Sequence, residues 1–148
     1  MKLSISDDVR MFLYDTVVDR GIPPTSVEIG DHFGLAPDKA RELLGSIHIG
    51  KTLLTHPSTG EIWMAGPFSA VETQYRVIGK RATWWANCAW DMFGVAMIVG
   101  EPVRIDTHCT DCGEPWTLSA DPECPPDQQG IVHFLLPARQ WYEDIGFT

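Results

Sequence analysis

Basic residues are scarce in this sequence. Its 148 residues include eleven Lys and Arg against twenty Asp and Glu, which gives a formal net charge of -9 at pH 7. Affinity for nucleic acids rests largely on Lys and Arg side chains that neutralise phosphates. A nucleic-acid partner is therefore not expected.

Several motifs are also missing. The chain has no glycine-rich phosphate loop, no G-x-S-x-G elbow and no HExxH motif, so nucleotide chemistry and serine hydrolysis are not supported. The N-terminus lacks a charged-then-apolar signal pattern, and Asn87 and Asp91 interrupt the most apolar run of the chain. We therefore expect a cytoplasmic protein with no membrane partner.

What is present predicts a folded α+β protein. Hydrophobic residues make up 44% of the chain and charged residues 21%, the balance of a globular protein. Residues 1–66 show three helical patterns and then two short apolar runs around a turn, the order of a winged helix-turn-helix lobe. The helices are expected at Ser4–Arg20, from Thr25 to the turn at Gly34, and from Pro37 to about Ile47, and the hairpin strands at Thr52–Thr55 and Ile62–Ala65.

The charge of this lobe argues against DNA reading. Residues 1–66 hold six Lys or Arg and nine Asp or Glu, a net charge of -3. The helix that would enter a DNA groove carries Lys39 and Arg41, but Asp38 and Glu42 balance them. We interpret the lobe as a packing or dimerisation element, so that a homodimer is one alternative.

The second half of the chain is richer in proline, glycine and β-prone runs. Residues 67–82 are expected to link the lobes, and residues 83–148 to form a small mixed β-sheet packed on a buried helix from about Asn87 to Val99. The C-terminal segment is expected to begin as a helix. Strands are expected at Val103–Asp106, Trp116–Ser119 and Ile131–Leu136.

Cys88 and Asp91 are the first candidate site, because a spacing of three residues on a helix brings two side chains onto one face. With Asn87 as the cap, the positive end of the helix dipole would favour a thiolate at Cys88. An apolar wall of Trp84, Trp85, Trp90 and Phe93 would raise the pKa of Asp91 and keep a proton available. The alternative is a buried core cysteine beside a hydrogen-bonded carboxylate.

The segment "HCTDCGE", residues 108–114, is the second candidate site. Without an export signal, the four cysteines of the chain indicate free thiols, a metal site or a catalytic site. Cys109 and Cys112 have the spacing of half a zinc site, which Cys124 or His133 could complete with zinc or copper bound. A strand turn with incidental thiols and a redox dithiol remain alternatives.

The motifs together resemble the alkylmercury lyase (organomercurial lyase) family. That family has an aromatic-x-x-Cys-Ala-x-Asp motif, an apolar helix ending in Gly, a strand leading to a cysteine and Gly-x-Pro, and an apolar strand closed by Leu-Pro. This chain has "WWANCAWD", an apolar run to Gly100, "VRIDTHCTDCGEPWTLS" and "VHFLLP". The motifs cover roughly Trp84 to Pro137, and the N-terminal lobe resembles the family by architecture alone.

The resemblance implies protonolysis of carbon–mercury bonds without a cofactor in residues 83–148, with mercury(II) as the product. It implies that the Cys88 thiolate binds mercury, that Asp91 delivers the proton beside it, and that Cys109 is structural. The family's second catalytic cysteine falls at or just past Thr148, where the sequence ends, so turnover is expected to be impaired unless Cys112 substitutes for it.

Two other functions stay open from the sequence. One is a non-catalytic metal-binding or regulatory module with the lyase fold, in which Cys109 and Cys112, with or without Cys124, hold zinc or copper and the N-terminal lobe binds a partner. The other is an enzyme of the same fold that acts on another substrate with Cys88 as its nucleophile.

Overall fold

A seven-stranded antiparallel sheet extends through the protein. The computed structural model describes residues 5–47, 52–124 and 130–145. The strand order is β1-β2-β3-β5-β4-β6-β7, and every strand pair in the described part of the chain is antiparallel. The elements are α1 (Ile5–Arg20), α2 (Ser26–Phe33), α3 (Pro37–Ser46), β1 (Leu53–Thr55), β2 (Ile62–Ala65), β3 (Phe68–Ser69), β4 (Arg76–Ile78), β5 (Thr83–Ala86), α4 (Asp91–Val99), β6 (Val103–His108), β7 (Pro115–Ala120) and a 3-10 turn (Ala138–Gln140).

The N-terminal elements follow the predicted order. Thr25 caps α2, and Glu28 returns the hydrogen bond to the Thr25 backbone, which completes a capping box. Pro37 occupies the first turn of α3, where its missing N–H costs nothing. Three helices and the β1–β2 hairpin are therefore present as expected, while the winged-helix assignment itself stays a prediction.

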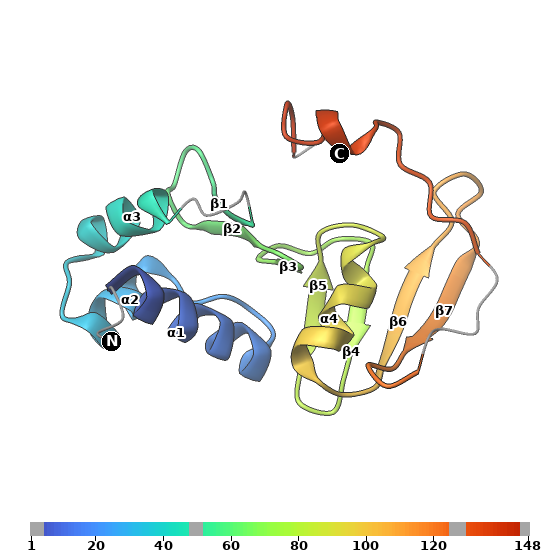
Figure 1. Cartoon of the computed structure of the whole chain (residues 1–148), viewed down its shortest axis with the longest axis horizontal. Coiled ribbons are helices and arrows are strands. Elements are labelled where there is room, and N and C mark those ends of the chain that lie inside the picture. Colours follow the sequence, from blue (N-terminus) through green and yellow to red (C-terminus); the bar gives the residue numbers. More distant parts are fainter. Residues whose placement is uncertain (1–4, 48–51, 125–129, 146–148) are drawn as a thin grey trace.

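The sheet differs from the expected small mixed sheet. Residues 67–82, expected as a linker, contain β3 and β4, and these strands join the hairpin to the second half of the chain. Figure 1 shows the sheet passing from the green hairpin to the orange β6 and β7. The boundaries 1–66, 67–82 and 83–148 remain a prediction about domains, since one sheet crosses all three ranges.

The expected strand at Ile131–Leu136 is wrong, because those residues form an irregular segment. Ile131 is 94% exposed and Leu135 73% exposed, and no strand of the described residues pairs with this run. A β-prone apolar run becomes a strand only when a neighbouring strand satisfies its backbone. The segment instead crosses above the molecule to the C-terminal 3-10 turn, which matches the helical start expected there (Figure 1).

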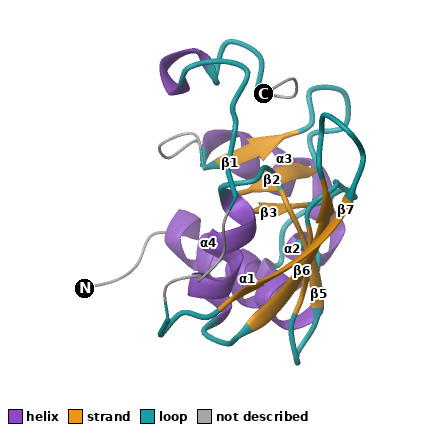
Figure 2. Cartoon of the chain, turned by 90° about the vertical axis from the view of Figure 1, so that its right-hand side faces the viewer, coloured by secondary structure: helices purple, strands orange, loops and turns teal. Residues whose placement is uncertain are grey.

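Helix α4 covers one face of the sheet. Its residues Met92, Val95 and Val99 are buried against the sheet, whereas Met97 and Ile98 on the other side of the helix are exposed. Figure 2 shows α4 on one side of the strands. The helix is therefore buried on one side only, whereas the sequence had predicted a buried helix.

Helix α1 joins two hydrophobic cores. Val9 and Leu13 pack with α2, α3 and the hairpin, and Val17 packs with α4 and the sheet. The fully buried Trp84 of β5 donates a hydrogen bond from Nε1 to the carbonyl oxygen of Val17, at 2.7 Å. At the end of α1, Gly21 has φ +93°, and a Cβ there would collide with the Thr83 carbonyl oxygen, so glycine lets α1 end against β5.

Both basic side chains of α3 are paired with acids. Lys39 contacts Glu42 at 2.7 Å, and Arg41 bonds to Asp38 and, at 3.2 Å, to Glu61. This pairing leaves α3 without an unpaired positive charge among its described residues. None of the described helices is long and apolar enough to span a membrane.

Replacing Trp84 tests this anchor. Trp84→Ala should lower the free energy of unfolding by about 3–5 kcal/mol, because it removes a buried aromatic side chain and a buried hydrogen bond. Denaturant unfolding followed by circular dichroism measures the change. The matched control is Trp90→Ala, since Trp90 is 69% exposed and its loss should cost less than about 1 kcal/mol. Equal costs for the two variants would contradict this account.

Candidate functional site

Cys88 lies in the turn between β5 and α4, and α4 begins at Asp91. The predicted helix start near Asn87 is wrong. The backbone N–H of Asn87 donates to the carbonyl oxygen of Pro67, at 3.2 Å, and so continues the hydrogen bonding between β5 and β3 by one more bond. The turn still brings Cys88 and Asp91 together, since the Met92 amide donates to the Cys88 carbonyl at 3.2 Å. The two side chains therefore meet at the start of the helix rather than along one helical face.

The Cys88 thiol donates a hydrogen bond to the Asp91 carboxylate. Burial raises the pKa of Cys88, and the negative charge of Asp91 raises it further. The backbone amides of Asp91 and Trp90 donate to the sulfur and lower this pKa, but burial outweighs them. The helix start thus acts on the thiol as expected, yet the resting group is a neutral thiol rather than a thiolate.

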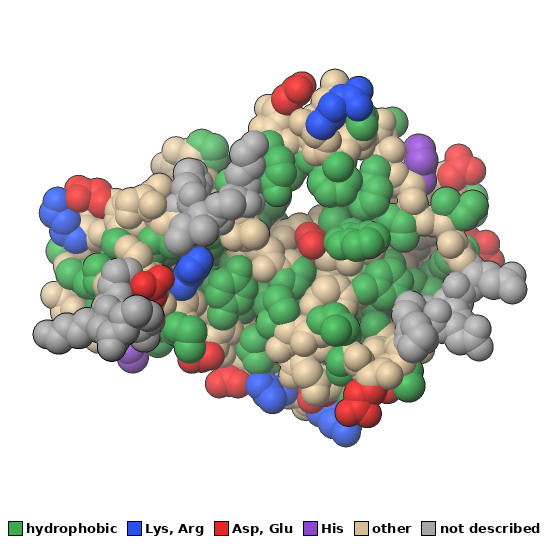
Figure 3. Space-filling view, viewed as in Figure 1, with side chains coloured by type: hydrophobic (Ala, Val, Ile, Leu, Met, Phe, Trp, Pro, Cys, Tyr) green, Lys and Arg blue, Asp and Glu red, His purple; other side chains and the backbone are tan. Residues whose placement is uncertain are grey.

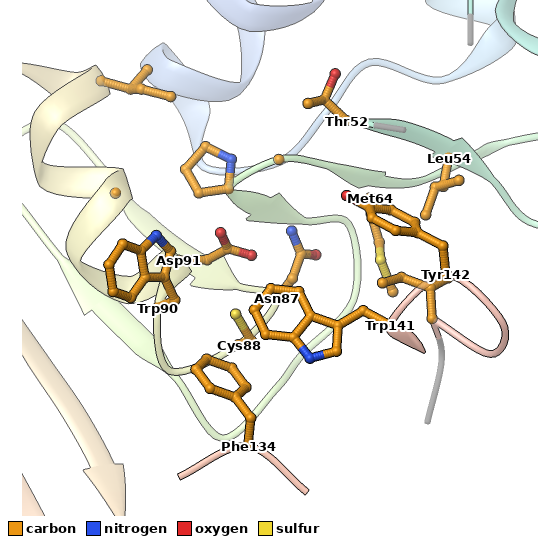
Figure 4. Close-up of a pocket in the computed structure, with 15 residues that line it drawn as sticks. Thr52, Leu54, Met64, Asn87, Cys88, Trp90, Asp91, Phe134, Trp141 and Tyr142 are labelled. Atoms are coloured by element: carbon orange, nitrogen blue, oxygen red, sulfur yellow. The ribbon is translucent and has the colours of Figure 1, made fainter. Parts of the chain in front are cut away.

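Burial also raises the pKa of Asp91, although the hydrogen bonds from Cys88 and the Asn87 carboxamide lower it. Asn87 was expected only as a helix cap, and the sequence offered no sign that it contacts Asp91. The buried Oδ1 of Asn87 accepts no hydrogen bond from any of the described residues. Figure 4 shows Asn87, Cys88 and Asp91 grouped in the pocket. The site therefore contains a carboxyl group that contacts both a thiol and an amide.

The pocket around this group has a volume of about 440 Å³ and is largely apolar. Three parts of the chain form its wall: the β1–β2 hairpin with the Gly66–Pro67 turn that follows it, the turn before α4 with α4 itself, and the C-terminal segment. Trp90 is the one member of the expected aromatic wall that lines it, because Trp84 is in the core and Phe93 faces a second pocket. The other large apolar wall residues are Leu54, Met64, Pro67, Ile98, Phe134, Trp141, Tyr142 and Ile145.

The C-terminal segment closes the top of this pocket. Phe134 and Trp141 pack with ring centroids 4.7 Å apart, and the Trp141 Nε1 donates to the Leu136 carbonyl oxygen at 2.9 Å. Figure 3 shows an opening beneath this segment with hydrophobic side chains gathered around it. The aromatic residues of the runs "FLLP" and "QWY" could therefore have indicated the site from the sequence. Phe134, Trp141 and Tyr142 line the pocket, and none of them belongs to a strand.

The remaining thiols lie elsewhere. Cys109 and Cys112 are in the turn between β6 and β7, and Cys124 is exposed beyond β7. His133 lines a second pocket of about 290 Å³ together with Cys109. Within the described ranges, however, no set of three His, Cys, Asp or Glu residues is placed to hold a metal ion. The expected completion of a zinc or copper site by Cys124 or His133 is therefore not supported.

Comparison with known proteins identifies a family for this chain. A family model described as "MerB: Alkylmercury lyase" matches residues 68–147, which include Cys88, Asp91 and the β6–β7 turn. The chain belongs to the alkylmercury lyase family. This is a family of organomercurial lyases, which need no cofactor and release mercury(II).

A solved structure shares the fold. The structure titled "Crystal structure of the mercury-bound form of MerB2" has a TM-score of 0.59 and 18% sequence identity, and the match covers 80% of this chain and 57% of that chain. This chain therefore spans less than two thirds of that protein's length. A comparison with curated protein sequences finds no match.

Removing the Asp91 charge should make Cys88 more reactive. Asp91→Asn removes the negative charge that raises the Cys88 pKa, so that pKa should fall. The alkylation rate of Cys88 from pH 6 to 10 measures it, in a chain whose other cysteines are serine. The control is Asp31→Asn, an exposed carboxylate on α2. An unchanged or higher Cys88 pKa would show that the two groups do not interact.

Asn87→Ala should raise the pKa of Asp91, because it removes a donor that stabilises the carboxylate. Carbon NMR of labelled aspartate side chains follows the titration directly. Asn87→Ser, which retains a short donor, should give an intermediate pKa. If both variants titrate like the unmodified chain, the amide does not orient Asp91.

Proposed function

We propose that this protein cleaves the carbon–mercury bond of organomercurials by protonolysis, with Cys88 as the mercury ligand and Asp91 as the proton donor. The observation that carries the proposal is the contact between the Cys88 thiol and the Asp91 carboxylate in an apolar pocket, within the residues that match the family. Soft mercury prefers thiolate over oxygen and nitrogen ligands.

In the first step the Cys88 sulfur adds to mercury, while R and X both stay bound to the metal. An organomercurial R–Hg–X, where X is a small thiolate, enters the pocket, and the Cys88 sulfur bonds to mercury as its proton passes to Asp91. The existing hydrogen bond gives this proton its path. Burial raises the pKa of Asp91, which favours the protonated carboxyl group once the thiol proton has passed to it.

The second step returns the proton to carbon. Asp91 protonates the carbon bound to mercury, the carbon–mercury bond breaks and the hydrocarbon R–H leaves. Mercury(II) stays on the Cys88 sulfur with the thiolate X as its second ligand. The apolar wall, including Trp90, Phe134 and Trp141, would hold the organic group and exclude water that competes for the proton.

Cys88 is the one cysteine among the described residues that line this pocket. A thiol from solution would therefore supply the second sulfur that loads electron density onto mercury. On this proposal the substrate brings the metal, no resident cofactor takes part, and the protein works in the cytoplasm, where small thiols are abundant.

The test is hydrocarbon release from phenylmercury in excess monothiol. Asp91→Asn should lower turnover by about 10²- to 10⁴-fold, the usual contribution of a positioned proton donor, and Cys88→Ser should reduce it to the rate without protein. Cys124→Ser is the thiol control, since Cys124 is exposed and does not line the pocket. Benzene is measured by gas chromatography. Full activity in Cys88→Ser would overturn the assignment of Cys88.

A further inference from the structure

The turn between β6 and β7 holds two thiols in a closed loop. The Cys109 amide donates to the Glu114 carbonyl at 2.8 Å, and the Gly113 amide donates to the Cys109 carbonyl at 2.9 Å. Gly113 has φ +75°, a conformation that favours glycine and reverses the chain after Cys112. The backbone therefore fixes both cysteines on one short loop at the end of a six-residue ladder.

The two thiols of this loop interact. The Cys109 sulfur accepts hydrogen bonds from the backbone amides of Asp111 and Cys112 and from the Cys112 thiol. Such amide donors stabilise a sulfur that carries negative charge or binds a metal. Cys112 is exposed and Cys109 is partly exposed, so an ion from solution can reach both.

The number of ligands selects the kind of ion. Within the described ranges the pair has no third His, Cys, Asp or Glu placed to complete a metal site. Structural zinc requires four ligands, so two thiols do not hold it. Mercury(II) differs because it is satisfied by two thiolates in a linear arrangement, and it prefers sulfur.

The loop also lies close to the candidate active site. Strand β4 lies between β5 and β6 and is antiparallel to both, so β5 and β6 run in the same direction and end at the same edge of the sheet. Cys88 follows β5 and Cys109 follows β6 in the chain, so each comes after a strand end at this edge. Strand β4 separates β5 from β6, so these two strands lie about 10 Å apart, side by side with β4 in Figure 1. Tyr75, just before β4, interacts with Cys88 and lines the second pocket with Cys109.

We propose that Cys109 and Cys112 form a second mercury site, which takes mercury(II) from Cys88 as a bis-thiolate. The origin of the ion at Cys88 rests on the proposed lyase function, whereas binding at the loop does not. The exchange is redox-neutral: two mercury–sulfur bonds to Cys109 and Cys112 form, and the bonds to Cys88 and the small thiolate break. The two protons of the loop thiols go to the two departing sulfurs.

Binding is tested with chains that retain two cysteines each. Cys88→Ser with Cys124→Ser leaves Cys109 and Cys112, and Cys88→Ser with Cys112→Ser leaves Cys109 and Cys124 as a control with the same number of thiols. The reduced proteins receive one equivalent of mercury(II) and then a millimolar excess of glutathione. The first chain should retain at least about tenfold more mercury by intact mass, because two linked thiols chelate the ion. Equal retention would overturn the proposal.

Transfer is tested on the unmodified chain. One equivalent of mercury(II) is added, free thiols are alkylated, and peptides are mapped by mass spectrometry. Cys109 and Cys112 should be protected, while Cys88 and Cys124 are alkylated. Protection of Cys88 with an alkylated loop would overturn the transfer. Neither experiment needs turnover, so inactivity toward phenylmercury would refute the lyase function and leave the second site standing.

Discussion

The burial of one thiol and one carboxyl group in a single apolar pocket is the constraint on which the site depends. Burial disfavours the charged form of both Cys88 and Asp91, so their pKa values rise together and a proton is held between them. An exposed aspartate, with an ordinary pKa of about 4, would be ionised at neutral pH and would hold a proton far less readily. The pocket wall, drawn from the hairpin, α4 and the C-terminal segment, therefore determines the chemistry as much as the two groups do.

Strand β5, which leads into the turn that holds this pair, is the central strand of the sheet. Strand β5 is hydrogen-bonded to β3 on one side and β4 on the other, and its Trp84 anchors α1 from beneath. Helix α1 shares its buried residues between two cores, so the N-terminal elements and the sheet form one body. This continuity lets Leu54 and Met64 of the hairpin line a pocket whose reactive groups lie more than twenty residues later in the chain.

Local sequence signals predicted the local structure correctly, but they did not predict which distant segments pair as strands. Thr25 and Pro37 marked helix starts correctly, since a cap or a first-turn proline acts through its immediate neighbours. Strands β3 and β4 are only two and three residues long, so their sequences are too short to show a strand pattern. Pairing with neighbouring strands is what stabilises them. The Cys88–Asp91 contact was foreseen from spacing, but the neutral thiol was not, because burial depends on residues such as Phe134 and Trp141 that are distant in sequence.

The two proposed thiol sites would suit different forms of mercury for a physical reason. An organomercurial has one strong bond to carbon, so it needs a single thiolate and an apolar surface for its organic group, which the pocket at Cys88 offers. The bare ion has no organic group to bury and gains from a second thiolate, which the exposed loop at Cys109 and Cys112 offers. Loss of the hydrocarbon removes what the pocket binds best. Cleavage of the carbon bond would thus itself shift the preference of mercury from the pocket at Cys88 to the loop at Cys109 and Cys112.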